Sequence, residues 1–316
     1  MSTEKLLIDA DPGIGDALAV ALALVDPKID VLAVTGCGGR VSGEQASLNL
    51  QTVVSIIDPD RWPRIGWSDS PAIGVPRHGE ATILRDGPKG LGQCEPFDVE
   101  LHQRHDSARV LIDLVRTYPE QLTLLTLGPL TNVHAAMERY PEFLSQLKEL
   151  ICLGGSIHGT GDISPAAEFN IHSDPEAARA VLTSPATKTL VPLETAGQLM
   201  LSFEQYDRIA IDAYSRLGRL VTQLLPFGLR ENRQLLGLEG VQLPDVVALA
   251  AVSRPRLFER ESLPVDVELS GELTRGMTVF DRRGNQRYRA NIDVLTDVDV
   301  QGVLDDLRQR LRAADV

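Results

Sequence analysis

The sequence is poor in aromatic residues and cysteines and has no long apolar run. Aromatic side chains make up 4% of the 316 residues, which leaves few rings to stack on a planar ligand. The three cysteines, Cys37, Cys94 and Cys152, show no CxxC spacing and leave an odd count, which favours a reducing compartment. No stretch approaches the roughly 18 apolar residues of a membrane-spanning helix. Glu4 and Lys5 directly precede the first apolar run, so we expect no signal peptide and a cytoplasmic protein.

The net charge is strongly negative. The chain has 31 Lys and Arg against 44 Asp and Glu, a formal charge of −13, which argues against broad binding to nucleic acid or to anionic membranes. Apolar residues make up 43% and charged residues 24%, as in ordinary globular proteins. Because no linker, repeat or low-complexity tract interrupts the chain, we predict a single domain over residues 1–316.

Apolar runs typical of strands alternate along the chain with runs of helical period. Strands are predicted at residues 6–8, 31–35, 121–127, 150–153 and 187–193. Helices are predicted at residues 17–24, 42–57, 107–118, 131–139, 174–182 and 213–225. Residues 60–105 are predicted as a loop at the rim of the site, and residues 265–294 as a late hairpin. The repeated order of strand, glycine loop and helix predicts an α/β fold, with a mostly parallel sheet, helices on both faces and a Rossmann-like open core.

Three carboxylates gather where the first predicted strand gives way to the first helix. Asp9 and Asp11 are two residues apart, so on a strand their side chains would point to the same side. Asp16 falls in the first helical turn, where backbone N–H groups favour an anion. Clustered carboxylates repel one another, and a cation among them removes that cost. The pattern predicts a divalent-metal site; an N-cap with two solvated neighbours would also explain it.

Other polar residues fall where the predicted sheet places its loops. Glu168 and Asn170 are two residues apart, so both could project into one cavity and hold hydroxyl groups, or they could cap the helix at 174–182. Asp245 follows Pro244 and opens the apolar run 246–252. An N-cap role alone would explain Asp245.

Several motifs follow one another in a specific order along the chain. They are Asp9-Ala10-Asp11-Pro12-Gly13 with Asp16-Ala17, Leu127-Gly128-Pro129-Leu130-Thr131-Asn132, Gly154-Gly155, Pro165-Ala166-Ala167-Glu168-Phe169-Asn170, Asp174-Pro175-Glu176-Ala177-Ala178, Asp245, and Gly271-Glu272-Leu273-Thr274-Arg275-Gly276. With these motifs the chain resembles the inosine–uridine-preferring nucleoside hydrolases from Leu6 to about Val294. The resemblance implies a nucleoside hydrolase-like fold and hydrolysis of the N-glycosidic bond of a nucleoside.

The resemblance also implies one bound Ca²⁺. The positions that match its ligands are Asp11, Asp16, the backbone carbonyl of Leu127, and Asp245, with Asp9 orienting a ligand from behind. Carboxylate and carbonyl oxygens are hard donors, and Ca²⁺ takes about 6–8 of them, so water and sugar hydroxyls would complete its shell. Asp11 would also act as general base toward the attacking water.

The sugar contacts and the assembly state are implied in the same way. Glu168 and Asn170 match residues that hold ribose hydroxyls, and Leu153 matches an apolar residue under the sugar. The expected partner is a small nucleoside-like molecule, with no nucleic acid and no membrane. Because family members are commonly homodimers or homotetramers, we expect a homo-oligomer.

Five positions depart from the family pattern. Gly15 stands where the family carries an Asp that hydrogen-bonds the ribose 2′-hydroxyl. Arg40 and Asp162 each replace an Asn, Pro244 replaces a His implicated in protonating the leaving base, and Asp86 replaces a second His. General acid catalysis supplies about 10²–10⁴-fold, so these losses predict altered specificity. We expect a substrate that differs at the 2′ position or carries an anionic group that Arg40 could pair with.

Two alternatives remain open at this point. A catalytically weak or silent relative could bind a nucleoside or sugar without cleaving it. A haloacid-dehalogenase-like phosphatase also opens with Asp-x-Asp, but the chain lacks a convincing downstream Ser/Thr and Lys pair. His78 and His158 could replace the missing acid, and Tyr214 and Phe227 could contact the base. Solvated loops for the histidines and core positions for the aromatics are the simpler interpretations.

Overall fold

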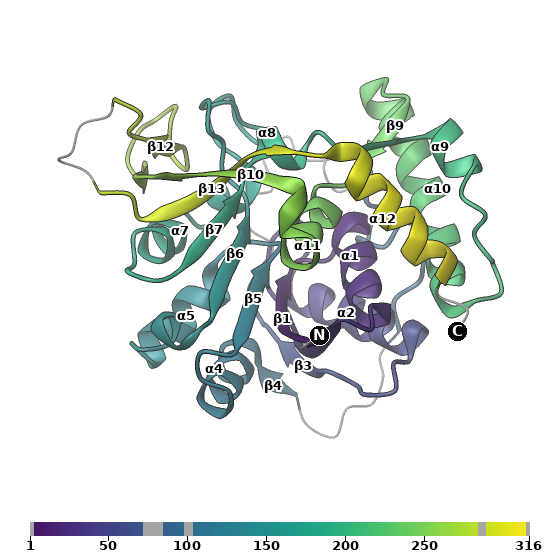
Figure 1. Cartoon of the computed structure of the whole chain (residues 1–316), viewed down its shortest axis with the longest axis horizontal. Helices are drawn as coiled ribbons and strands as arrows, with labels where there is room; N and C mark the ends of the chain where they lie inside the picture. The colour runs from purple at the N-terminus through teal and green to yellow at the C-terminus, as the bar shows by residue number, and fades with distance from the viewer. Residues whose placement is uncertain (1–2, 72–84, 98–103, 284–288, 314–316) are drawn as a thin grey trace.

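A nine-stranded sheet in the described part of the chain runs through the middle of the computed structural model (Figure 1). The structure describes residues 3–71, 85–97, 104–283 and 289–313. In spatial order the strands are β10 (Phe258–Leu263), β13 (Ile292–Val298), β7 (Lys188–Val191), β6 (Glu149–Leu153), β5 (Leu122–Thr126), β1 (Glu4–Ala10), β2 (Ile29–Gly36), β3 (Arg64–Trp67) and β4 (His105–Asp106). Two small antiparallel pairs lie apart from it: β8 (Met200–Ser202) with β9 (Gly240–Gln242), and β11 (Val265–Val267) with β12 (Thr278–Phe280).

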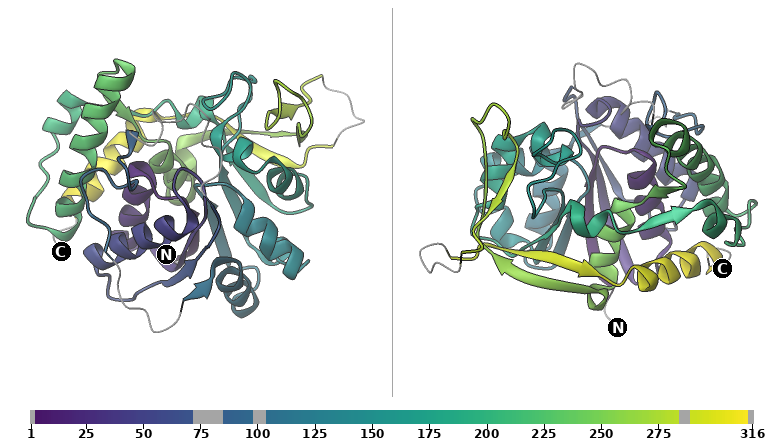
Figure 2. Two further views of the ribbon diagram at one scale, coloured as in Figure 1. Left: turned by 180° about the vertical axis from the view of Figure 1, so that it is seen from behind. Right: turned by 90° about the horizontal axis from the view of Figure 1, so that it is seen from above.

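Helices cover both faces of the sheet. On one face lie α1 (Ile14–Val25), α2 (Gly43–Ile57), α10 (Arg216–Leu236), α11 (Pro244–Ser253) and α12 (Val300–Ala313), and on the other α4 (Ser107–Thr117), α5 (Thr131–Arg139) and α7 (Pro175–Leu182) (Figures 1 and 2). Three short helices, α6 (Phe169–Ser173), α8 (Leu193–Ala196) and α9 (Phe203–Asp207), lie in the connections. All strand pairs of the sheet are parallel except β10 with β13. The predicted α/β class is confirmed.

The central strand β1 and helix α1 form the first strand–turn–helix unit. Leu6, Leu7 and Ile8 are fully buried, as expected for a strand covered on both faces. Gly13 has no side chain to cap α1, so the Asp16 carboxylate accepts a hydrogen bond from the Gly13 N–H at 3.0 Å. That bond satisfies a backbone donor that the start of a helix leaves without a partner.

The strand order reverses at β1. Strands β2, β3 and β4 follow on one side, and β5, β6 and β7 on the other. In open α/β sheets the ligand crevice lies beyond the carboxyl ends of the strands at such a reversal. Asp11 follows β1 and Leu127 follows β5, so the first implied metal ligands meet at this crevice.

Two predicted boundaries were wrong. Residues 60–105 are not loop throughout, because β3 lies within them and pairs in parallel with β2; four residues are too short to show a period. Residues 72–84 and 98–103 lie outside the described residues. Helix α10 continues to Leu236 with Pro226 inside it, whereas a proline more often ends or kinks a helix. The late hairpin is confirmed as β11 and β12.

Two further observations concern the cysteines and the helices. Cys37, Cys94 and Cys152 are all buried and free. Over the residues that the structure describes, no helix is both long and apolar enough to cross a membrane.

Candidate active site

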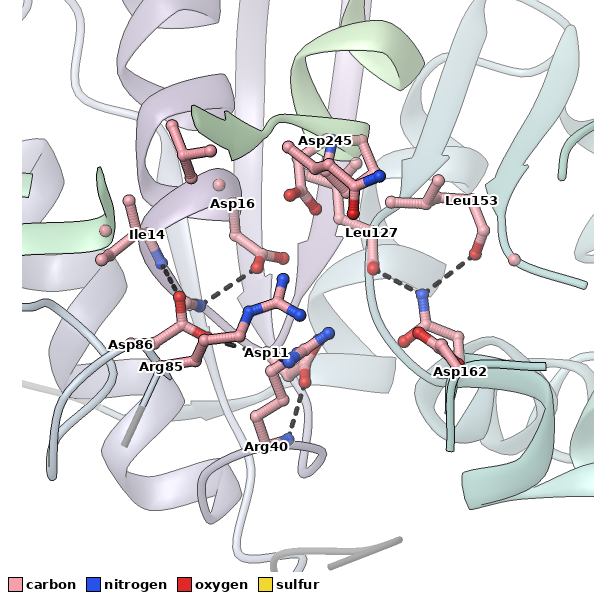
Figure 3. A pocket seen from close by; sticks show the side chains of 18 of the residues that line it. Asp11, Ile14, Asp16, Arg40, Arg85, Asp86, Leu127, Leu153, Asp162 and Asp245 are labelled. Atoms are coloured by element: carbon pink, nitrogen blue, oxygen red, sulfur yellow. Dashed lines mark hydrogen bonds and ion pairs between the residues drawn. The ribbon is translucent and has the colours of Figure 1, made fainter. Parts of the chain in front are cut away.

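A cavity lies beyond the carboxyl ends of the central strands (Figure 3). It collects side chains and carbonyls from loops that are far apart in the sequence. The residues expected at the site that line it are Asp11, Asp16, Arg40, Leu127, Leu153, Asp162, Glu168, Asn170 and Asp245. Asp9 does not line the cavity but is buried beneath it. The structure therefore brings the expected set together around one opening.

Asp9 and Asp11 occupy different environments although they are two residues apart. Asp9 Oδ1 accepts hydrogen bonds from the Thr35 hydroxyl and the Asn132 amide, and its Oδ2 is buried without a partner. Burial raises the pKa of Asp9 to about 7, against the lowering effect of these two donors. Asp9 is thus held under the cavity, where it can orient the turn but cannot reach a ligand.

Asp11 faces the cavity in a tight backbone pocket. Its Oδ2 accepts a hydrogen bond from the Arg40 N–H at 2.8 Å. A Cβ at Gly39 would lie 2.1 Å from the Asp11 Oδ2, and one at Gly128 would lie 2.5 Å from its Oδ1, so neither position has room for a side chain. Burial raises the pKa of Asp11 to about 7, opposed by Arg40 and reinforced by Asp245. Asp11 is thus a buried carboxylate whose proton affinity is raised in the metal-free chain.

Asp16 and Asp245 approach the same cavity from two helices. Both lie in first helical turns, of α1 and α11. Burial, then the charges of Asp245 and Asp11, raise the pKa of Asp16, and burial raises the pKa of Asp245 to about 6. Asp245 is not the N-cap that one interpretation predicted, because Leu243 holds that position and no side chain caps α11. Its carboxylate turns toward Gly15, where a Cβ would lie 2.0 Å from Asp245 Oδ2.

The donor chemistry around Asp11, Asp16, Asp245 and the Leu127 carbonyl fits a hard divalent cation. The charge of Asp245 raises the pKa of both Asp11 and Asp16, and the charge of Asp11 raises that of Asp16 further. Asp16 Oδ1 is buried without a hydrogen-bond partner among the described residues. Within the described ranges, no three His, Cys, Asp or Glu side chains are gathered closely enough to hold a metal ion as they stand. Oxygen donors of this kind suit Ca²⁺, and binding would require the carboxylates to close around the ion.

Glu168 and Asn170 form the opposite wall. Glu168 accepts hydrogen bonds from the backbone N–H groups of Gly155, Asn170 and Ile171, at 2.9, 3.0 and 3.1 Å, and so caps α6 rather than the helix at 174–182, which Asp174 caps. Burial, then the Asp162 charge, raise the pKa of Glu168 to about 8.

The Asn170 amide is fixed by backbone oxygens. Its Nδ2 donates to the carbonyls of Leu127 and Leu153, at 2.7 and 3.0 Å. Asp162 Oδ1 accepts a hydrogen bond from the Phe169 N–H at 2.9 Å and so holds the start of α6. The Asn170 side-chain oxygen remains available to a ligand hydroxyl in the cavity.

The candidate aromatic and histidine residues lie elsewhere. Tyr214 is 92% exposed and is neither at the cavity nor in the core. Phe227 is partly buried and packs against the core, as the simpler interpretation predicted. His158 is not in the cavity wall, and His78 lies outside the described residues.

Three polar residues of the cavity, Arg85, Asn232 and Gln242, were missed from the sequence. Arg85 reaches into it next to Asp86 (Figure 3), and Asn232 enters from α10 with a buried Oδ1 that has no partner. A polar residue on the buried face of α10, in step with Leu225, Gly228 and Leu229, is a sequence signal that could have revealed Asn232. The segment around Arg85 has no period and gave no such signal.

The raised carboxyl pKa values predict an unusual pH dependence for the metal-free protein. Asp9, Asp11 and Glu168 keep their protons in the folded chain up to about pH 7–8, whereas unfolded carboxyls lose them near their ordinary values. The folded state therefore binds more protons in this window, and its stability falls as pH rises from about 4 to 8. Ca²⁺ should stabilise the protein more at about pH 8 than at about pH 5.5, because protons compete for the same carboxylates.

Thermal unfolding with chelator and with Ca²⁺, recorded across this pH range, checks the prediction. An unfolding temperature of the chelated protein that rises steadily with pH would contradict it. If Ca²⁺ raises the unfolding temperature equally at about pH 5.5 and at about pH 8, protons and metal do not compete for the same carboxylates.

Comparison with known proteins shows the class of enzyme to which this fold and this site belong. A sequence model of the inosine-uridine preferring nucleoside hydrolase family matches residues 6–305. The chain is 34% identical to uridine nucleosidase 1 of Arabidopsis thaliana, over 98% of this chain and 93% of that protein. It is 33% identical to the non-specific ribonucleoside hydrolase RihC of Salmonella enteritidis, over 94% of each chain. The purine-preferring ribonucleoside hydrolase from Gardnerella vaginalis has a similar structure, with a TM-score of 0.87, 25% identity, and 98% and 99% of the two chains covered. The chain belongs to the inosine-uridine preferring nucleoside hydrolase family.

Proposed function

We propose that this protein hydrolyses the N-glycosidic bond of a nucleoside or related N-riboside in a Ca²⁺-dependent reaction, giving free base and sugar. The observation that carries the proposal is the meeting of Asp11, Asp16, Asp245 and the Leu127 carbonyl at one cavity. These four groups would hold the ion. When bound, Ca²⁺ would acidify a water molecule and anchor sugar hydroxyls.

Asp11 is the proposed general base. Its carboxylate lines the cavity beside the proposed cation site, where it would accept the proton of the attacking water. The water oxygen bonds to the anomeric carbon, and the base departs with the electron pair of the C–N bond through an oxocarbenium-like transition state. Asp9, held beneath the turn by Thr35 and Asn132, would orient a metal ligand from behind.

The opposite wall would hold the sugar. The Asn170 side-chain oxygen accepts a ribose hydroxyl, and the lone pairs of Glu168 that its three backbone donors leave free accept another. Leu153 offers an apolar surface beneath the ring. Asp162 fixes the start of α6, which carries Asn170.

Specificity is proposed to differ from that of common family members. Gly15 provides no carboxylate for the 2′-hydroxyl, and Asp245 fills the space beside it. Pro244 offers no proton to the leaving base. A relative that binds nucleosides without efficient cleavage is the second candidate, favoured by the same two positions.

A panel of nucleosides separates these possibilities. We expect kcat/KM for uridine and inosine below about 10⁴ M⁻¹s⁻¹, the lower edge of the usual enzyme range, with a faster rate on another N-riboside. Release of base is followed by chromatography, with purified inactive protein as blank. Values of about 10⁶ M⁻¹s⁻¹ or more on uridine or inosine would contradict altered specificity.

We also propose that the protein is cytoplasmic and forms a homo-oligomer. The free, buried cysteines are compatible with a reducing compartment. Support for the assembly comes from the family resemblance alone. Sedimentation of the purified protein would give its mass directly, with a monomer contradicting the proposal.

A further inference from the structure

Two arginine side chains, Arg40 and Arg85, project into the cavity among its carboxylates (Figure 3). Arg40 comes from the loop after β2, and Arg85 from the loop before Asp86. Two guanidinium groups held close together repel each other and lose hydration. The surrounding groups, or a ligand, must therefore compensate the two positive charges.

Arg40 is committed to groups of the protein. Its Nη1 lies 3.8 Å from Asp86 Oδ2, and its guanidinium stacks over the Phe169 ring at 4.9 Å. Asp86 is itself fixed, since its Oδ1 accepts a hydrogen bond from the Ile14 N–H at 3.2 Å. Arg40 and Asp86, two of the departures from the family pattern, thus face each other as an ion pair. Arg40 lines the cavity, as expected, but its charge is already shared with Asp86; that it pairs with a substrate anion stays a prediction.

Arg85 is placed differently. Within the described residues its guanidinium forms no hydrogen bond and no ion pair. Burial, then the neighbouring Arg40 charge, lower its pKa, while Asp86, Asp162 and Asp245 act only through their charges. A guanidinium carries five N–H donors in a planar fork. Because Arg85 is only partly buried, these donors are open to water or to a ligand that enters the cavity.

The acids of the cavity do not supply them. Glu168 and Asp162 accept backbone N–H groups, and Asp86 is shared between Arg40 and Ile14. Asp16 and Asp245 belong to the proposed cation site, where a dication would take up their charge. The Arg85 donors are therefore left facing the space that the substrate would fill.

We propose that Arg85, supported by the Arg40–Asp86 pair, binds a negatively charged group of the substrate. The inference rests on the proposed hydrolase function and names its substrate class: an N-riboside that carries a carboxylate or a phosphate. Both anions present paired oxygens that match the guanidinium fork. The carboxylate would be carried by the base and the phosphate by the sugar.

Two matched pairs of compounds test whether Arg85 binds an anion, and they distinguish a carboxylate on the base from a phosphate on the sugar. Orotidine against uridine adds only a carboxylate on the base, and uridine 5′-monophosphate against uridine adds only a phosphate on the sugar. Binding is measured by calorimetry with the Ca²⁺-loaded protein, and hydrolysis by base release. We expect one charged member to be favoured over uridine by about 10–100-fold, as for hydrogen bonds to a charged group.

Substitutions test whether the preference for the charged compound over uridine depends on Arg85. Arg85→Gln should bring the charged-to-neutral ratio close to one, and Arg85→Lys should keep part of it, because charge remains but the fork is lost. Lys89→Gln on the same loop removes a charge that pairs with Glu95 at the surface, and this control should keep the full ratio.

The outcomes separate the inference from the function. If uridine is hydrolysed but both charged members bind no better than uridine, the inference is wrong and the hydrolase stands. The inference is also wrong if Arg85→Gln leaves a measured preference intact. If no compound is hydrolysed while one charged member binds tightly through Arg85, the hydrolase proposal fails and the anion site stands.

Discussion

Replacing Asp11 by Ala is expected to abolish most hydrolysis. The substitution removes the proposed general base, whose contribution alone is about 10²–10⁴-fold in kcat, and one proposed Ca²⁺ ligand. The folded chain should tolerate the change, because Asp11 is a buried carboxylate whose burial raises its pKa to about 7. Steady-state base release from the fastest substrate of the panel, measured beside thermal unfolding, checks both expectations.

Asp60→Ala is the matched control. Asp60 is exposed and does not line the cavity, so its loss changes the net charge equally without touching the site. If Asp11→Ala retains more than about a tenth of the activity while Asp60→Ala is fully active, Asp11 is not the base.

The second large effect is on stability. Glu168→Ala should lower the free energy of unfolding by about 3 kcal/mol, about 1 kcal/mol for each of the three backbone N–H groups that lose their acceptor. Those groups belong to Gly155, Asn170 and Ile171, at the wall that holds Asn170. The free energy is obtained from urea unfolding followed by circular dichroism.

Glu168→Gln is the informative comparison. Glutamine keeps one acceptor oxygen, so it can serve either Asn170 alone or Gly155 and Ile171 together, and it should lose less stability than alanine. Equal stability of wild type and Glu168→Ala would show that the cap is not needed for the fold. The residue would then be explained by sugar binding alone.

The local chemistry of the first turn could be predicted from the sequence. The apolar run before Asp9 and the helical run after Asp16 place both residues at a strand end and a helix start, and the structure agrees. The α/β class followed from the same alternation. These features depend on neighbours within a few residues, which is the range that periodicity reports.

Periodicity could not predict which residues from distant parts of the chain meet at the site. Asp245 lies on α11, far along the chain, and only the family resemblance connected it to Asp11. The direction of its carboxylate depends on the space left by Gly15. Arg85 was missed because its loop has no period, and the ion pair between Arg40 and Asp86 could not be predicted because the two residues lie on different loops. Tertiary contacts decide each of these cases. That residues 1–316 form one domain stays a prediction.

The most direct test of the central claim is base release under control of calcium. The purified protein is assayed on the nucleoside panel after exhaustive chelation, and again after Ca²⁺ is restored, with bound metal measured by elemental analysis. Hydrolysis that is lost on chelation and returns with about one Ca²⁺ per chain is the predicted result. Undiminished hydrolysis by protein shown to be free of metal would contradict the proposed calcium-dependent reaction.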